Sequence, residues 1–296
     1  MTRRLLLDVS SLMYRAFFAM GDTVKTRDER PAGAVHGYLD WTARLARDRG
    51  HDEVIHCYDH EWRPVARTDM YDGYKAARPD EPPVLTAQFE MLRTVLDLAG
   101  FDQAQAPGWE AEDAIAALAA QATADDRIEM VSGDRDLIQL VRDPTTKLLY
   151  TVRGVSELHE FDEAAVQEKY GMAPQRYGDF AILRGDPSDG LPGVKGVGEK
   201  TALALVQAYG SLDEILEDAA RDATKVPGPL KGKPALKARL TESAGYIETM
   251  RKLVPPNAGA ELDRWTGERD EETLKALLDD LALKGPMQRL TAALQS

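Results

Sequence analysis

Short apolar runs alternate with longer amphipathic segments over the first 155 residues of the chain. The apolar runs have the length of buried strands and occupy residues 4–8, 53–59, 127–132 and 147–152. Helical spacing of apolar residues marks the segments at residues 34–49, 84–99 and 110–122. This alternation predicts an α/β fold with a parallel central sheet and helices on both of its faces.

The pattern changes after Val155, where no strand is expected. Helical patterns follow near residues 162–170, 174–184, 198–209, 211–219, 235–249 and 270–283. The sequence therefore predicts an α/β core over residues 1–155 and an all-α region over residues 156–296. Within the core, residues 60–82 are polar and broken by proline and glycine, which predicts an irregular or loosely helical segment.

The composition is typical of a folded protein in a reducing compartment. Of the 296 residues, 43% are hydrophobic and 29% are charged, which excludes a largely disordered chain. The single cysteine, Cys57, excludes a disulfide within the chain and a cysteine-based zinc site. The longest apolar runs are far shorter than the roughly 20 residues of a membrane span, and the first residues do not form a secretory signal. We therefore expect a cytoplasmic protein with no membrane partner.

The net charge of −13, taken alone, argues against a polyanionic partner. The charge is unevenly distributed, however. Residues 223–240 contain no acid and five basic residues, which are Lys225, Lys231, Lys233, Lys237 and Arg239. This basic run predicts contacts between the backbone of a nucleic-acid duplex and Lys231, Lys233 and Lys237. A solvated linker is the alternative.

Nine carboxylates gather at the predicted ends of strands and at the starts of a helix and a turn. They are Asp8, Asp59, Asp134 and Asp136 after three strands, Glu110, Glu112 and Asp113 at a helix start, and Asp186 and Asp189 in the turn 185–193. The carboxyl ends of parallel strands meet at one edge of a sheet, so we expect these acids to lie near one another. Divalent cations would remove their mutual repulsion, which predicts a site for two or more Mg²⁺ or Mn²⁺ ions. Solvated acids and helix caps are the alternative.

A glycine-rich turn joins two predicted helices within residues 185–210. Residues 191–202 read LPGVKGVGEKTA. A P-loop is excluded, because Glu199 stands where the P-loop has its lysine and no strand precedes the turn. A helix–hairpin–helix turn fits instead, since bare glycine N–H groups can approach a DNA phosphate while lysines add charge. The residues expected to contact DNA there are Gly193, Lys195, Gly196, Gly198 and Lys200. A plain connection between helices is the alternative.

Five segments resemble, in order and spacing, the motifs of the 5′-nuclease or flap endonuclease superfamily. They are LLLDVSSLMYRAFFAM (5–20), CYDHEWRPVARTDMYDGYKAARP (57–79), PGWEAEDAIAALA (107–119), VSGDRDLIQLV (131–141) and GDPSDGLPGVKGVGEKTA (185–202). The likeness covers roughly residues 3–255 and is greatest to the 5′-3′ exonuclease domain of bacterial DNA polymerase I. All nine acidic positions are kept, although Glu112 stands where bacterial members usually carry aspartate.

The resemblance implies a PIN-like 5′-nuclease fold, with a helical arch within residues 60–100 that contains Lys75 and Arg78, and a helix–hairpin–helix at 185–210. It implies that the nine acids hold two or more Mg²⁺ or Mn²⁺ ions, with Asp113 and Asp186 acting less directly. It also allows a monovalent cation at the helix–hairpin–helix.

Further roles are implied for basic and aromatic side chains of the first two motifs. Lys75 and Arg78 of the arch would act in catalysis by gripping the scissile phosphate and screening its charge. The residues implied to contact DNA are Tyr14, Arg15, Arg67 and Tyr74. An aromatic face such as that of Tyr14 accepts any base, although a core position is the alternative for this residue.

The sequence therefore predicts a structure-specific 5′-3′ exonuclease and flap endonuclease of replication and repair. Its expected partners are DNA with 5′ flaps, nicks or 5′ ends, and RNA primers paired to DNA are further candidates. We expect a monomer. Two alternatives stay open, which are a DNA-structure-binding protein of the same fold with little or no catalysis and an RNA-directed nuclease.

Overall fold

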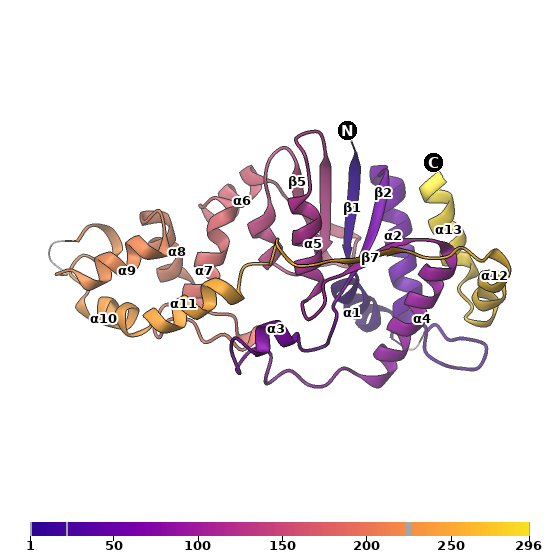
Figure 1. Ribbon diagram of the computed structural model, residues 1–296, viewed down its shortest axis with the longest axis horizontal. Helices are drawn as coiled ribbons and strands as arrows, with labels where there is room; N and C mark the ends of the chain where they lie inside the picture. Colours follow the sequence, from indigo (N-terminus) through magenta and orange to yellow (C-terminus); the bar gives the residue numbers. More distant parts are fainter. Residues whose placement is uncertain (1, 22, 223–225, 296) are drawn as a thin grey trace.

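A sheet of seven strands runs through the centre of the molecule (Figure 1). The structure is a computed structural model that describes residues 2–21, 23–222 and 226–295. The strands are β1 (Arg3–Asp8), β2 (Glu53–Tyr58), β3 (Asp102–Gln105), β4 (Arg127–Ser132), β5 (Thr146–Arg153), β6 (Glu157–Phe161) and β7 (Asp263–Thr266). They lie in the order β6-β5-β4-β1-β2-β3-β7. The five inner strands pair in parallel, and the edge strands β6 and β7 pair antiparallel with β5 and β3.

Alternate side chains of β1 enter two hydrophobic cores, one on each face of the sheet. Leu5 and Leu7 belong to one core and Leu6 to the other, and all three are fully buried. The first core is covered by α1 (Val9–Met20), α2 (Gly33–Arg49), α4 (Pro83–Ala99), α12 (Glu271–Asp280) and α13 (Lys284–Gln295). The second is covered by α5 (Ala111–Ala120), α6 (Glu163–Tyr170) and α7 (Tyr177–Arg184). The sheet is therefore buried on both faces, as the sequence predicts.

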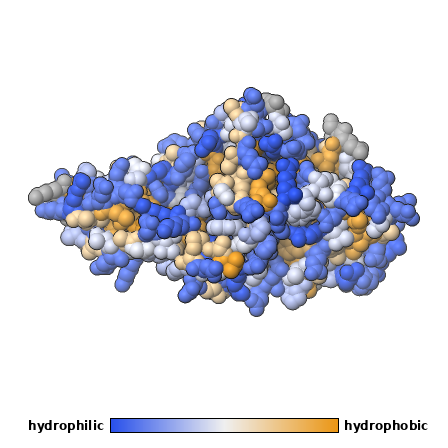
Figure 2. Space-filling model, viewed as in Figure 1, coloured by the Kyte–Doolittle hydropathy of each residue, from blue (hydrophilic) through white to orange (hydrophobic). Residues whose placement is uncertain are grey.

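Beyond α7 the chain builds a helical lobe at one end of the elongated molecule (Figure 1). The lobe contains α8 (Glu199–Ala208), α9 (Leu212–Ala220), α10 (Pro234–Glu242) and α11 (Ala244–Leu253). The chain then returns along the sheet as β7, after which α12 packs against α4 and α13 against α2. The same view coloured by hydropathy shows a largely hydrophilic surface with separate hydrophobic patches (Figure 2). A membrane crossing needs a longer and more apolar helix than any that the described ranges contain.

The four predicted strands are confirmed as β1, β2, β4 and β5, but the expectation of no strand after Val155 is wrong. Both β6 and β7 are edge strands with many exposed side chains, so they carry too few apolar residues to stand out. The polar strand β3 also escapes the pattern. Its Gln103 is buried because it bonds to Asp97 and to Tyr58 (2.6 and 2.8 Å).

Each helical segment predicted after Val155 contains a helix, although residues 235–249 are divided between α10 and α11. The apolar pattern does not predict α1 and α13. The division of the chain at residue 155 stays a prediction.

Residues 60–82 form an irregular segment, as expected. Their one α-helix is the short α3 (Val65–Thr68), and turns occupy most of the residues that follow it. The helix that the resemblance implies for the arch around Lys75 and Arg78 is therefore absent. Lys75 has a positive φ of 50°, which a continuing right-handed helix does not allow.

Candidate active site

The parallel strands β1, β2 and β4 deliver three acids to one edge of the sheet. Asp8 ends β1, Asp59 follows β2, and Asp134 comes two residues after Ser132, the last residue of β4. The Asp8 carboxylate accepts hydrogen bonds from the Ser11 N–H (2.9 Å) and the Ser132 hydroxyl (2.5 Å). The first bond caps α1 and the second ties β1 to β4, so ordinary helix and sheet contacts fix this carboxylate in the site.

The start of α5 adds two further acids to the same region. Glu110 is its N-cap and forms a capping box with Asp113, whose carboxylate accepts from the Glu110 N–H (3.0 Å). The Asp59 carboxylate accepts from the N–H of Ala111 (2.8 Å), which fixes this helix against the end of β2. Glu112, in the first turn, is buried at the site.

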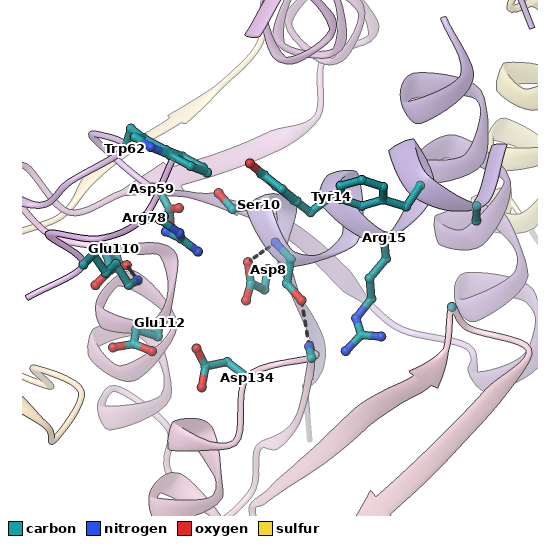
Figure 3. A pocket seen from close by; sticks show the side chains of 16 residues that line it. Asp8, Ser10, Tyr14, Arg15, Asp59, Trp62, Arg78, Glu110, Glu112 and Asp134 are labelled. Atoms are coloured by element: carbon teal, nitrogen blue, oxygen red, sulfur yellow. Dashed lines mark hydrogen bonds and ion pairs between the residues drawn. The ribbon is translucent and has the colours of Figure 1, made fainter. Parts of the chain in front are cut away.

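These acids line one cleft of about 610 Å³ (Figure 3). Five predicted metal ligands contribute to its wall, which are Asp8, Asp59, Glu110, Glu112 and Asp134. Four of the predicted catalytic or DNA-contacting residues line it as well, which are Tyr14, Arg15, Lys75 and Arg78. Segments that are far apart in the sequence thus meet in a single cavity.

Glu112, Asp134 and Asp136 form a set that could hold a metal ion. One carboxylate oxygen from each lies within 4.8 Å of those from the other two. Burial raises the pKa of Glu112 well above its ordinary value despite Arg67, and burial together with Asp134 does the same for Asp136. Buried and half-buried acids that repel one another fit a hard divalent cation, which prefers carboxylate oxygens and would neutralise their charge.

Burial and neighbouring charges also shift the pKa values of other acids at or near the cleft. Burial, with the charge of Asp59, raises the pKa of Asp8 to about 7. Burial and Glu110 raise the pKa of Asp59. Asp189 reaches the site from the turn after α7, and burial raises its pKa to about 6 although Lys75 opposes the rise. The whole edge of the sheet is therefore an acidic site that favours positive charge.

Lys75 and Arg78 face this acidic site in different ways. The Lys75 ammonium is buried, donates to Glu110 and lies 3.7 Å from an Asp189 oxygen. Arg78 lines the cleft with its guanidinium 4.4 Å from the ring centroid of Trp62. Both cations are thus present where the sequence predicts them, but on turns.

Two family models match the chain in succession. Residues 3–171 match the N-terminal resolvase-like domain of the 5′-3′ exonucleases, and residues 172–267 match their C-terminal SAM fold. The chain belongs to the 5′-3′ exonuclease family. The resemblance in the five motifs is confirmed, and the chain is a nuclease.

Sequence matches to relatives cover most of the chain. A 5′-3′ exonuclease of Streptomyces coelicolor is 40% identical, and the match covers 98% of this chain and 99% of the relative. A 5′-3′ exonuclease of Mycobacterium tuberculosis is 39% identical over 84% of this chain and 82% of the relative. DNA polymerase I of the same species is 38% identical over 97% of this chain, which spans 31% of that polymerase.

Two solved structures share the fold. The bacteriophage T5 D15 flap endonuclease, in a pseudo-enzyme-product complex with DNA and metal ions, superposes with a TM-score of 0.66 at 17% identity, over 99% of this chain and 100% of that one. Human GEN1 in complex with Holliday junction DNA gives a TM-score of 0.64 at 16% identity, over 99% of this chain and 71% of that one. The predicted α/β nuclease fold with its helical C-terminal part is confirmed.

Arg67 of the exonuclease lies inside the protein, which corrects its predicted role as a DNA contact. Its guanidinium donates to Glu110 (2.8 Å), Glu112 (2.5 Å), both oxygens of Asp113 (2.6 and 3.0 Å) and the carbonyl of Leu253 (3.1 Å). Only 1% of the residue is exposed, so no phosphate can reach it. Arg67 instead orients the acids at the start of α5 and ties them to the end of α11.

Tyr74 needs the same correction. It is buried, and its hydroxyl donates to Glu110 (2.6 Å). Glu110 therefore accepts hydrogen bonds from Arg67, Tyr74 and Lys75. Burial acts to raise the pKa of Glu110, but the Lys75 and Arg67 cations hold it below its ordinary value.

Asp113 and Asp186 both have structural contacts, and their less direct metal role stays a prediction. Asp113 is fully buried, and its oxygens accept from Arg67, the Glu110 N–H and the N–H of Asn257 (2.7 Å). Asp186 caps the short turn η3 (Pro187–Asp189) by accepting from the Ser188 N–H (2.9 Å). Its charge still contributes to the raised pKa of Asp136.

The glycine-rich turn connects α7 to α8, as the helix–hairpin–helix interpretation requires, and those helices are in contact. Lys195, Gly196, Gly198 and Lys200 are exposed on it. Gly193 differs from the prediction, because its N–H donates to the hydroxyl of Tyr246 (3.0 Å) and is not free for a phosphate. A side chain at Gly193 would lie 2.5 Å from backbone atoms of Arg184, so glycine serves the close packing of the turn.

The basic run is only partly available for DNA. Lys231 and Lys233 are exposed. Lys237 is buried and donates to the carbonyl of Asp218, which corrects its predicted contact with DNA. Lys225 lies outside the described residues.

Replacing both Lys231 and Lys233 by glutamine is expected to flatten the salt dependence of duplex binding. Removing one lysine–phosphate ion pair should reduce the slope of log K against log salt by about 0.9. The slope is measured by fluorescence anisotropy at several salt concentrations. Lys275→Gln, an exposed change on α12, is the control and should leave this slope unchanged. An equal slope in the double variant and the control would mean that this run is only a solvated loop.

Proposed function

We propose that this nuclease hydrolyses phosphodiester bonds of DNA at 5′ ends, nicks and 5′ flaps, with divalent cations held in the acidic cleft. The observation that carries the proposal is the set Glu112, Asp134 and Asp136, with Asp8 and Asp59 lining the same cleft. The DNA and metal ions in the T5 flap endonuclease complex and the DNA in the GEN1 complex support a nucleic-acid substrate.

The fit of the acids to cations follows from their chemistry. All are oxygen donors, burial raises the pKa values of Glu112, Asp136 and Asp8, and no protein cation is bonded to Asp136 among the described contacts. We propose Mg²⁺ or Mn²⁺, in two sites. When bound, such ions supply positive charge that lowers the pKa of water and stabilises a leaving oxygen.

The chain's own residues then place the DNA. Asp8, Asp59, Glu112, Asp134, Asp136 and Asp189 hold the cations, and Glu110 anchors Lys75 beside them. Lys75 and Arg78 screen the charge of the scissile phosphate. Exposed groups of the helix–hairpin–helix and the basic run hold the duplex, and Tyr14 offers a ring at the cleft for a base. The expected products carry a 5′-phosphate and a 3′-hydroxyl.

The decisive experiment is cleavage of an end-labelled double-flap DNA with Mg²⁺, Mn²⁺ or EDTA, with products mapped at nucleotide resolution. We expect cleavage at the base of the 5′ flap with either metal and none with EDTA. A flap that begins with RNA tests RNA primers in the same assay. Flap binding without cleavage in either metal would favour a DNA-structure-binding protein of the same fold.

A further inference from the structure

Trp62 joins two residues that the proposed function places at the substrate. Its indole stacks on the ring of Tyr14, with centroids 5.5 Å apart and ring planes inclined by 14°. The guanidinium carbon of Arg78 lies 4.4 Å from the centroid of the Trp62 ring. Tyr14 comes from α1 and Arg78 from the turns after α3, so the indole connects two walls of the cleft (Figure 3). The sequence pattern alone gives this residue no role.

Polar contacts hold the indole against the backbone that carries Arg78. The Trp62 Nε1–H donates to the carbonyl of Pro79 (3.1 Å). The neighbouring Arg63 donates to the carbonyl of Arg78 (2.6 Å) and to the carboxylate of Asp80 (3.2 Å). The position of the indole is therefore coupled to the turn from which Arg78 projects.

Trp62 lines both the cleft and a second cavity of about 220 Å³. The two cavities share Ser10, Asp59 and Trp62, and the second is otherwise lined by residues that include Tyr58 and Phe89. Removal of the indole would open the cleft toward this cavity. A nucleotide strand would then have more than one way to lie beside the acids.

We propose that Trp62 is a positioning residue that determines which phosphate is cut. The indole fixes the ring of Tyr14 and the guanidinium of Arg78, and it closes the cleft on the side of the second cavity. One base is then held against the aromatic wall, and one phosphate lies beside Arg78. This inference rests on the proposed function, since it assigns Trp62 a role in the same cleft.

The first test compares Trp62→Leu and Trp62→Phe on the double-flap DNA. Because leucine removes the cation–π contact with Arg78, we expect kcat of the leucine variant to fall about tenfold and KM to change less than threefold. Cleavage should spread to neighbouring positions. Phenylalanine keeps an aromatic face, so it should restore most of the rate and the single cleavage position.

Trp265 provides a matched control. It stacks on Tyr58 (6.3 Å between centroids, 18° between planes), and the guanidinium carbon of Arg93 lies 5.2 Å from its ring. It has the same kinds of neighbours as Trp62 but does not line the cleft. Trp265→Leu should leave kcat and the cleavage position unchanged. Equal behaviour of the two leucine variants, with the wild type active, would overturn the role of Trp62 and leave the proposed function intact.

A double-variant cycle shows whether Trp62 acts through Arg78. In an Arg78→Ala background, Trp62→Leu should lower kcat no more than about twofold further. A full additional tenfold loss would mean that Trp62 does not position Arg78.

Intrinsic fluorescence gives a readout that needs no cleavage. The chain has four tryptophans, and we expect flap DNA added in EDTA to change the emission of Trp62. The change should persist in Trp265→Phe and disappear in Trp62→Phe. If the emission of Trp62→Phe changes as much as that of the wild type when DNA is added, Trp62 does not contact the DNA. This conclusion holds even if the wild type cuts no flap.

Discussion

Replacing Asp134 and Asp136 together by asparagine is expected to lower flap cleavage about a thousandfold or more. The amides keep the shape of the side chains but remove the charge that would hold cations at the ends of the strands. Metal ions contribute several kcal/mol to such reactions, and a loss of about 4 kcal/mol corresponds to a thousandfold. The measurement is single-turnover cleavage of the double-flap DNA with Mg²⁺.

The double variant should stay folded, which separates a lost site from a lost fold. Burial and Asp134 raise the pKa of Asp136 well above its unfolded value, so ionised Asp136 destabilises the folded state above the unfolded pKa. Removing this charge should leave the Tm of the metal-free protein equal or higher at pH 7. Mn²⁺ should raise the Tm of the wild type and not that of the variant.

A change at the opposite end of β4 provides the control. Asp125 is exposed in the loop before this strand, and Asp125→Asn should leave both cleavage and the effect of Mn²⁺ unchanged. Cleavage by the double variant within tenfold of the wild type would remove Asp134 and Asp136 from the metal site.

Arg67→Met is expected to lower the free energy of unfolding by about 3–5 kcal/mol. Methionine fills much of the same volume but leaves Glu110, Glu112 and Asp113 buried without their shared cation. Urea unfolding monitored by circular dichroism measures the loss. Arg67→Lys should be intermediate, because an ammonium keeps the charge but cannot reach all of the acceptors.

Arg63 is a suitable comparison for Arg67, since it lies in the same segment and its ion pair with Asp80 is exposed to solvent. Arg63→Met should lose no more than about 1 kcal/mol. A loss at Arg67 as small as the loss at Arg63 would show that the buried network is not what holds α5 to the end of α11.

The edge where the acids meet could be predicted because the signal is local. Each of β1, β2 and β4 is a short apolar run with its acid within two residues of the strand end. A parallel sheet then brings those ends together without further information. The convergence of Asp8, Asp59 and Asp134 therefore follows from the sequence pattern alone.

The partners of buried polar groups could not be predicted in this way. Arg67 and Tyr74 look like exposed groups in a polar segment, and only the fold shows that both point at the start of α5. Lys237 in the basic run is similar, because its acceptor is a carbonyl 19 positions away in the chain. A sequence shows that such a side chain can form hydrogen bonds, but not whether its partner is protein or DNA.

The helical lobe lies, in chain order, between the two edge strands of the sheet. After β6 at one edge, the chain passes through α6 and α7 before the lobe begins, and it returns from the lobe as β7 at the opposite edge. Two separate chain segments therefore connect the lobe to the rest of the molecule. In the proposed function, the distance between the helix–hairpin–helix turn and the acids acts as a spacer. It would fix how many base pairs separate the place where the duplex is gripped from the place where the strand is cut.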